Sequence, residues 1–164
     1  MTEKSICELL RCYLSPVNGI VGIYVSDKDG VRIVGGSECL KSDFSSLVSM
    51  EDAPEHAFMS FIVITFMNSL DQFAKLGFGK VENMLSKYQE MTLFQSVYVH
   101  SRNTPPLYLT VVGTSTCDLG ALTTLEVPLR PLLGHLALKA AEKLDEEAML
   151  MRNDTTGRFY TVGN

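Results

Sequence analysis

VSDKDGV, at residues 25–31, is the stretch that decides the fold of this chain. Strand-forming residues flank its polar centre on both sides. Asp27 and Asp29 are residues that turns favour, and Gly30 stands where a short hairpin connection needs a residue with positive φ. The pattern predicts a β-hairpin in which Asp27, Asp29 and Gly30 form the structural turn.

The same stretch has a catalytic interpretation, because phosphohydrolases of the haloacid dehalogenase class present two aspartates in a D-x-D-G pattern after an apolar strand. Asp27 would then be the nucleophile and Asp29 the general acid or base. That chemistry needs a second acidic pair to complete a magnesium site, but Asp118 stands alone and 145–147 belong to a predicted helix end. The class also uses parallel strands joined by helices, whereas a new strand starts directly after this stretch. A magnesium-dependent phosphohydrolase is therefore the weaker alternative.

Other catalytic or ligand-binding patterns are not recognisable. His56, His100 and His135 are far apart in the chain, and none pairs with a cysteine at metal-ligand spacing. The stretch GFGK at 77–80 lacks the spacer and the Ser or Thr of a phosphate-binding P-loop. We therefore predict no catalytic residue, no metal site and no cofactor, in a protein that is not an enzyme.

The composition is that of an ordinary folded domain with an acidic balance. The 164 residues carry a net charge of −5, and a chain of this size suits one domain. An acidic chain is a poor partner for nucleic acid and for anionic lipid. The longest apolar stretch, 57–67, is shorter than the ~20 residues that span a bilayer, so we expect no direct insertion into a membrane.

Periodicity and turn residues predict elements in the order α-β-β-α-β-β-β-α. They are a helix near 6–14, strands at 20–25 and 31–34, a helix over 55–76, strands at 83–89, 92–100 and 107–113, and a last helix over 118–147. Pro128 and Pro131 should kink or break that last helix. The order predicts an α+β sandwich with one antiparallel sheet. We expect residues 1–148 to form a single domain, with 35–52 as an extended loop and 149–164 as a disordered tail.

The central helix is apolar nearly all round, whereas a surface helix normally needs only one apolar side. It therefore needs a second cover besides the sheet. The polar loop at 35–52 covers aromatic side chains poorly, which favours a second chain. Helical periodicity places the side chains of this helix on two lines along its length. One line contains Phe58, Ile62, Thr65 and Ser69, and the other contains Phe61, Ile64, Asn68 and Leu70. Periodicity leaves open which line meets the sheet and which meets the partner.

The strand at 83–89 mixes apolar and polar residues, as does an edge strand that pairs with another chain. Proline at Ser86 should then remove a donor from that edge and weaken dimerisation. The predicted dimer interface combines helix and strand residues: Phe58, Phe61, Ile62, Thr65, Phe66, Ser69, Met84, Leu85, Ser86, Lys87 and Tyr88.

Several short motifs, taken in order, resemble the roadblock superfamily and, within it, the kinase-scaffold subunits of the Ragulator adaptor complex. The motifs are VSDKDGV at 25–31, APEH at 53–56, Asp71-Gln72, AKLG at 74–77, Pro106-Leu107, Leu125-Glu126 and Pro131-Leu132. Together they span most of residues 6–144. The chain departs from the family pattern in its longer 35–52 loop, in Pro128 and in the tail after 147.

The resemblance implies a five-stranded antiparallel sheet with the long central helix on one face and two terminal helices on the other. It implies a heterodimer with a second roadblock subunit; a homodimeric roadblock module that serves a motor or another small GTPase is the alternative. By analogy the dimer belongs to a Ragulator-like complex on the cytoplasmic face of late endosomes and lysosomes. A lipid-anchored subunit would hold it there, and unassembled chains would be cytosolic. The implied partners are the other Ragulator subunits, the Rag GTPases of TORC1 signalling and kinases of the mitogen-activated cascade.

Overall fold

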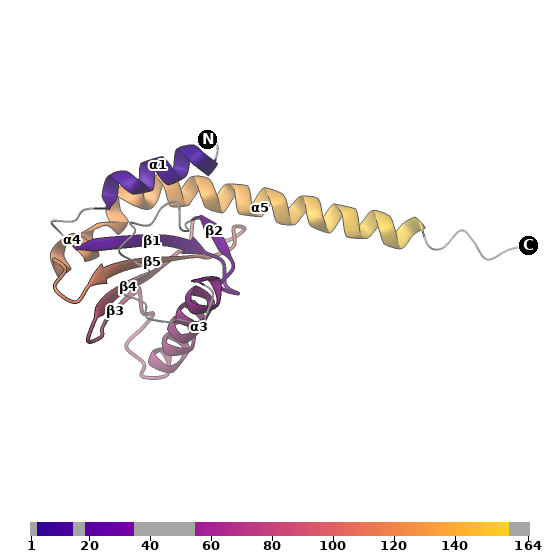
Figure 1. The fold of residues 1–164 in the computed structure, drawn as a ribbon. Helices are drawn as coiled ribbons and strands as arrows, with labels where there is room; N and C mark the ends of the chain where they lie inside the picture. Colours follow the sequence, from indigo (N-terminus) through magenta and orange to yellow (C-terminus); the bar gives the residue numbers. More distant parts are fainter. Residues whose placement is uncertain (1–2, 15–18, 35–54, 158–164) are drawn as a thin grey trace, which may run out of the picture.

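The structure is a computed structural model that describes residues 3–14, 19–34 and 55–157 (Figure 1). The elements are α1 (Glu3–Tyr13), β1 (Ile20–Ser26), β2 (Arg32–Val34), α3 (Glu55–Ala74), β3 (Asn83–Lys87), β4 (Met91–Tyr98), β5 (Leu107–Thr114), α4 (Leu119–Thr124) and α5 (Glu126–Gly157). Their order is the predicted one, with α4 and α5 in place of a single last helix. Within the described ranges, no helix is both long enough and apolar enough to cross a bilayer.

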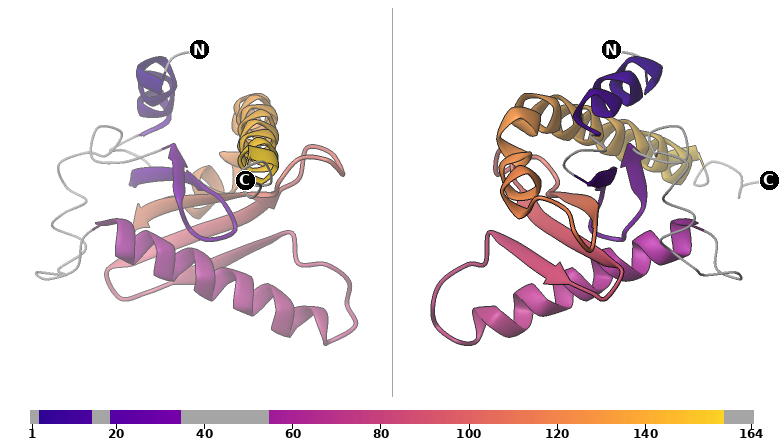
Figure 2. Two further views of the ribbon diagram at one scale, coloured as in Figure 1. Left: turned by 90° about the vertical axis from the view of Figure 1, so that its right-hand side faces the viewer. Right: turned by 60° about the vertical axis from the view of Figure 1, so that its left-hand side comes forward.

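The strands form one antiparallel, five-stranded sheet in the order β2-β1-β5-β4-β3. Figures 1 and 2 show α3 against one face of this sheet and α1 and α5 on the other side. This confirms the predicted α+β sandwich with one long helix on one face and two terminal helices on the other. The two edges of the sheet are β2 and β3.

Strand β5 shows how the sheet divides the core. Leu107, Leu109 and Val111 are fully buried among side chains of α1 and α5, whereas Tyr108 and Val112 pack with residues of α3. Side chains alternate between the two faces of a strand, so a strand covered on both faces has an almost continuous apolar sequence. The core therefore has two parts, and the part beside α1 and α5 is the larger one.

The hairpin and α3 are joined through Gly30. This residue has a φ of 75°, and Asp27 Oδ1 accepts hydrogen bonds from the backbone N–H of Asp29 at 2.9 Å and of Val31 at 2.8 Å. Ser60 Oγ, in α3, donates to the Gly30 carbonyl at 3.2 Å. The turn thus has the geometry that a tight hairpin requires, and it also contacts the helix.

Buried side chains hold α3 on the sheet. Val63 and Phe66 are completely buried and Ile62 is 8% exposed. The ring of Phe66 packs edge-on against Tyr108, with ring centroids 6.4 Å apart. Gln95 Nε2 donates to the Ile62 carbonyl at 3.4 Å. These contacts fix which side of α3 faces the sheet.

The last predicted helix is divided into α4 and α5, as expected from Pro128 but not from Pro131. Asp118 caps α4, because its Oδ1 accepts from two backbone N–H groups in the first turn. The helix α4 ends at Thr124. In a continuous helix, the ring of Pro128 would clash with the carbonyl of Thr124, four residues earlier. Pro131 lies inside α5 and does not end it.

The helix α5 continues through Gly157, so the tail predicted from residue 149 starts later than expected. Residues 138–151 are mostly Ala, Leu, Lys, Glu and Met, which favour helix, and they include no Gly or Pro. The expected loop at 35–52 and residues 158–164 lie outside the described residues, so those two expectations stay predictions.

Candidate protein interface

One side of α3 is exposed and carries a strip of apolar and small polar side chains. The strip runs through Phe61, Ile64, Thr65 and Asn68, of which Phe61 and Ile64 are 71% and 46% exposed. Residues three or four apart share one side of a helix, so these side chains are contiguous. The helix therefore buries one side in its own sheet and leaves an apolar strip open to a partner.

The structure divides the predicted helix residues of the interface. Phe61 and Thr65 are exposed and Ser69 is half-buried. Ile62 and Phe66 are buried in this chain's own core, so the structure corrects their assignment to the interface. The side chain of Phe58 lies outside the described residues. On the line through Phe61, the residues Phe61, Ile64 and Asn68 are exposed, whereas Leu70 packs against the core. Thr65, on the other line, is exposed as well.

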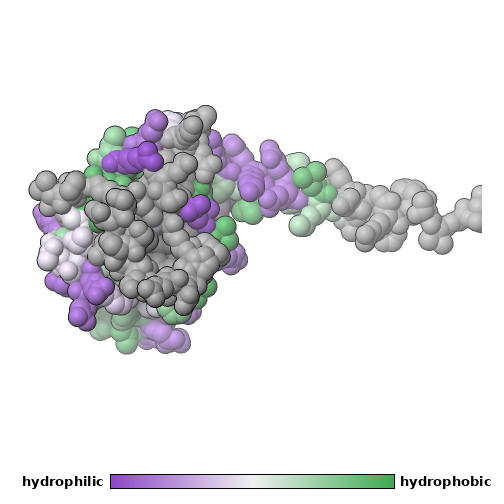
Figure 3. Space-filling view, viewed as in Figure 1, coloured by the Kyte–Doolittle hydropathy of each residue, from purple (hydrophilic) through white to green (hydrophobic). Residues whose placement is uncertain are grey.

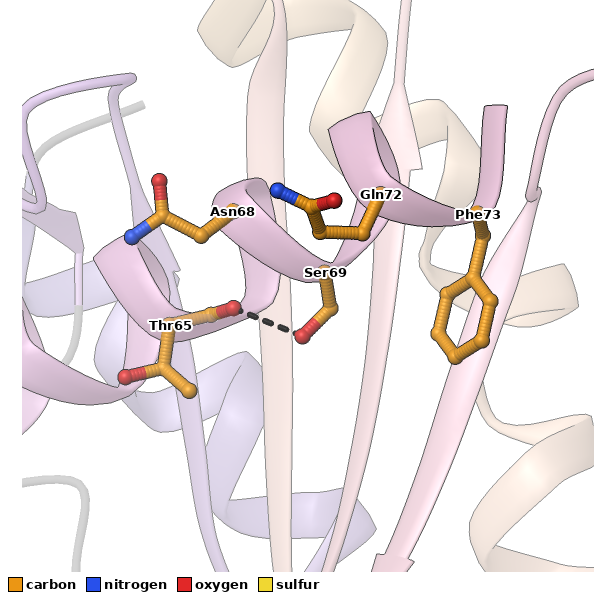
Figure 4. Close-up of a pocket in the computed structure, with 5 residues that line it drawn as sticks. All are labelled: Thr65, Asn68, Ser69, Gln72 and Phe73. Atoms are coloured by element: carbon orange, nitrogen blue, oxygen red, sulfur yellow. Dashed lines mark hydrogen bonds between the residues drawn. The ribbon is translucent and has the colours of Figure 1, made fainter. Parts of the chain in front are cut away.

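A shallow groove continues the exposed strip toward the end of α3 (Figure 4). It is lined by Thr65, Asn68, Ser69, Gln72 and Phe73. The hydroxyls of Thr65 and Ser69 donate to helix carbonyls one turn earlier, at 2.8 and 2.9 Å. The other lining groups are the carboxamides of Asn68 and Gln72 and the ring of Phe73, and Gln72 Oε1 accepts from Lys75 Nζ at 3.3 Å. These three residues are absent from the predicted interface, although their spacing from Phe61 and Thr65 is helical.

Strand β3 is the sheet edge next to α3. Met84 packs against side chains of α3, Leu85 and Tyr88 are 43% and 52% exposed, and Ser86 is half-buried while Lys87 is exposed. No described strand pairs with the outer edge of β3. The strand thus offers unpaired backbone groups beside the exposed strip of α3.

Hydrogen bonds at the two ends of β3 show which backbone groups point outward. Tyr88 N–H donates to the Met91 carbonyl at 2.8 Å, and Val97 N–H donates to the Glu82 carbonyl at 3.4 Å. Bonding groups alternate along an antiparallel ladder, so the even-numbered residues, including Ser86, bond to β4. The outward N–H groups belong to Asn83, Leu85 and Lys87. The expectation that proline at Ser86 removes an edge donor is therefore wrong.

The turn between β1 and β2 is a hairpin tip with its polar groups in local hydrogen bonds. Asp27 holds two backbone N–H groups, and Asp29 pairs with Lys28 Nζ at 3.3 Å on the exposed surface. β1 and β2 are antiparallel, unlike the parallel strands of the haloacid dehalogenase class. Within the described part of the chain, no three His, Cys, Asp or Glu residues are placed to hold a metal ion.

Tyr108 links the electrostatics of α3 and the hairpin. Burial raises the pKa of its phenol, the negative charge of Asp71 raises it further, and the positive charge of Lys28 acts in the opposite direction. The phenol lies under α3, 6.4 Å between ring centroids from Phe66. Tyr108 is therefore a core residue at this site, and a partner would contact the helix above it.

Comparison with known proteins identifies relatives over most of the chain. The family model described as mitogen-activated protein kinase kinase 1 interacting matches residues 4–140. The human Ragulator complex protein LAMTOR3 is 30% identical over 123 residues, which are 75% of this chain and 85% of that protein. The Drosophila melanogaster LAMTOR3 homolog is 31% identical over 124 residues, 76% of this chain and 86% of that protein.

Solved structures share the fold. A structure titled "MglB with tetrameric arrangement" matches with a TM-score of 0.60 and 13% identity over 85% of this chain and 93% of that chain. The gliding protein MglB of Thermus thermophilus matches with a TM-score of 0.59 and 13% identity over 85% of this chain and 94% of that chain. At this identity the likeness shows the fold alone. The family match and the LAMTOR3 relatives confirm the resemblance to the kinase-scaffold subunits of Ragulator that was drawn from the motifs, and the chain belongs to the mitogen-activated protein kinase kinase 1 interacting family.

Proposed function

We propose that this chain is a non-enzymatic scaffold subunit that forms a heterodimer with a second roadblock protein. The observation that carries the proposal is the unpaired edge of β3 beside the exposed strip of α3. An edge strand gives backbone hydrogen bonds to an added strand, and neighbouring apolar side chains give specificity. The two features together form one surface of the kind that a second sheet and helix cover.

In the proposed dimer, Asn83, Leu85 and Lys87 donate to the matching edge strand of the partner, so that one sheet continues through both subunits. Phe61 is the central anchor on the helix side, because it is 71% exposed and aromatic side chains dominate binding energy at interfaces. The carboxamides of Asn68 and Gln72 form a polar border to the contact. A stable interface of this kind buries about 1,600 Å².

The cellular role that we propose follows from the relatives, which are named as Ragulator complex proteins. The dimer would belong to a Ragulator-like complex at late endosomes and lysosomes. It would support Rag GTPases in TORC1 signalling and bring kinases of the mitogen-activated cascade to the same membrane. With a net charge of −5, the chain binds anionic lipid weakly, so a lipid-anchored subunit would hold the complex at the membrane.

The test is a pair of proline variants on β3, co-expressed with a candidate roadblock partner. Leu85→Pro removes an outward N–H and should abolish co-purification while circular dichroism stays close to wild type. Ser86→Pro breaks a bond to β4 and should reduce the folded fraction as well. Leu85→Ala is the matched control, because it keeps the backbone donor and removes the side chain. Retention of the partner by Leu85→Pro would show that β3 is not the dimer edge.

Two further measurements separate the proposal from its alternatives. Light scattering of the purified chain alone should give a monomer mass, whereas a stable dimer would favour the homodimeric module. Incubation with a generic phosphate ester and Mg²⁺ should release no phosphate. Phosphate release that is lost in Asp27→Asn would overturn the scaffold assignment. Persistence of this chain on membranes after removal of the anchoring subunit would contradict the proposed peripheral location.

A further inference from the structure

The last part of α5 extends away from the rest of the domain (Figure 1), and the left view of Figure 2 looks almost along the axis of this helix. We define residues 141–151 as the projecting segment. Every residue from 142 to 151 is exposed, and the match to the family model ends at residue 140. The projecting segment therefore lies beyond the part of the chain that the family model covers.

The projecting segment carries large apolar side chains on its surface. Leu144, Met149, Leu150 and Met151 are 53%, 66%, 68% and 74% exposed. The space-filling view shows apolar residues on this extension among the polar ones (Figure 3). An isolated helix of this length is marginal in water, and its stability normally comes from packing of an apolar side. Such a surface is typical of a site that another protein covers.

The apolar line that α5 uses in the core continues into the projecting segment. Ala137 is completely buried, and Leu144 and Met151 follow at steps of seven residues, with Ala141 and Ala148 between them. Residues at this spacing lie on one side of a helix and form the seam of paired helices. The side of α5 that packs in the core at Ala137 is thus exposed to solvent at Leu144 and Met151.

Acidic side chains border this line. Asp145 lies on one side of it and Glu147 on the other, as the 100° step of an α-helix requires. Over 141–151 four carboxylates, Glu142, Asp145, Glu146 and Glu147, stand against one ammonium group, Lys143, which gives a net charge of −3. Lys143 lies 4.0 Å from Glu147 on the same helix, so that ammonium group has a neighbour within the segment.

We propose that the projecting segment is a docking helix for a basic, apolar helix of another protein. The Leu144–Met151 line supplies the apolar contact, and the carboxylates that border it select lysine or arginine on the partner. A second copy of this chain would bring two segments of charge −3 together, which is unfavourable. An anionic membrane is disfavoured by the same charge. This proposal does not depend on the dimer interface, which lies on α3 and β3.

The test uses the full chain and two synthetic helical peptides of about three heptads, with Leu at the a and d positions. One peptide has Lys at the e and g positions and the other has Glu there. We expect the Lys peptide to bind in fluorescence anisotropy and the Glu peptide not to bind. Affinity for the Lys peptide should fall as salt rises, because salt screens the exposed charges.

Two double variants separate the contributions. Leu144→Gln with Met151→Gln removes the apolar line at constant charge, and Asp145→Asn with Glu147→Gln removes the bordering charge at constant shape. Each double variant should lower the affinity for the Lys peptide by about tenfold or more. All four positions are exposed, and circular dichroism checks that the fold is retained. Phe61→Glu, on the dimer surface, is the control that should leave peptide binding unchanged.

The proposal is overturned if the Lys peptide does not bind, or if the Glu peptide binds equally well. Equal binding to the Leu144→Gln with Met151→Gln variant would also overturn it, because the contact would then be charge attraction alone. Self-association of the chain that disappears in this variant would identify a second copy as the occupant and would likewise overturn it. Light scattering measures that outcome in the same samples.

Discussion

Gly30→Ala tests how much the contact between the hairpin tip and α3 contributes to stability. A Cβ at Gly30 would lie 2.7 Å from Ser60 Cα and 3.1 Å from Ser60 Cβ, and the residue has a φ of 75°. Positive φ costs a residue with a side chain about 1–2 kcal/mol, and overpacking against a helix backbone adds about 1–3 kcal/mol. We therefore expect Gly30→Ala to lower the free energy of unfolding by about 2–5 kcal/mol.

Gly77→Ala is the matched control for this substitution. Gly77 has a φ of 76°, and a Cβ there meets no described atom within 4 Å. The Gly77→Ala substitution has the same backbone penalty and the same loss of unfolded-state entropy as Gly30→Ala, but it lacks the steric contact with Ser60. Urea unfolding followed by circular dichroism gives both free energies. Equal losses at the two sites would refute the reasoning, because the contact with Ser60 would then contribute nothing.

Three further predictions use the same unfolding measurement. Asp27→Ala should cost about 1 kcal/mol, because two backbone N–H groups lose their acceptor; Asp27→Asn should restore most of it, and equal losses in both would contradict the turn role. Phe66→Ala should cost about 3–5 kcal/mol and Phe61→Ala about 0.5 kcal/mol or less, since the first side chain is buried and the second is exposed; the reverse order would mean that α3 is rotated. Because the pKa of Tyr108 is raised in the folded chain, the stability that its protonated phenol contributes should be complete below pH 10 and decrease as pH rises above the unfolded pKa. If the free energy of unfolding of Tyr108→Phe depends on pH above 10 in the same way as that of the wild type, this prediction is contradicted.

The hairpin could be predicted from sequence because its requirements are local. A positive-φ glycine after two turn-forming aspartates leaves few other structures, and the structure has Gly30 at a φ of 75°. The five-stranded sheet followed from the order of elements and from the resemblance. The rotation of α3 could not be predicted, because both of its sides are apolar in sequence. Only the contacts of Ile62 and Phe66 with the sheet show which side is buried.

The sequence also could not predict which backbone N–H groups of β3 point away from β4. Alternation of apolar and polar residues shows which side chains share a face, but backbone donors point within the plane of the sheet. Their direction depends on the two-residue loop before Met91, which places Tyr88 in a bond to β4. The length of α5 was misjudged for a different reason. Polar composition from Arg152 onward favoured a tail, whereas the preceding run of good helix formers continues the helix.

The unequal division of the core has a consequence for hydrogen exchange. Among the described side chains of α3, only Ile62, Val63 and Phe66 are buried, whereas α1, α5 and the sheet share the larger apolar cluster on the opposite face. Amides of α3 should therefore exchange through a partial opening in which the rest of the domain stays folded. A partner that binds the closed α3 slows this opening in proportion to its occupancy. The amide exchange rates of α3 would therefore report binding of the proposed partner.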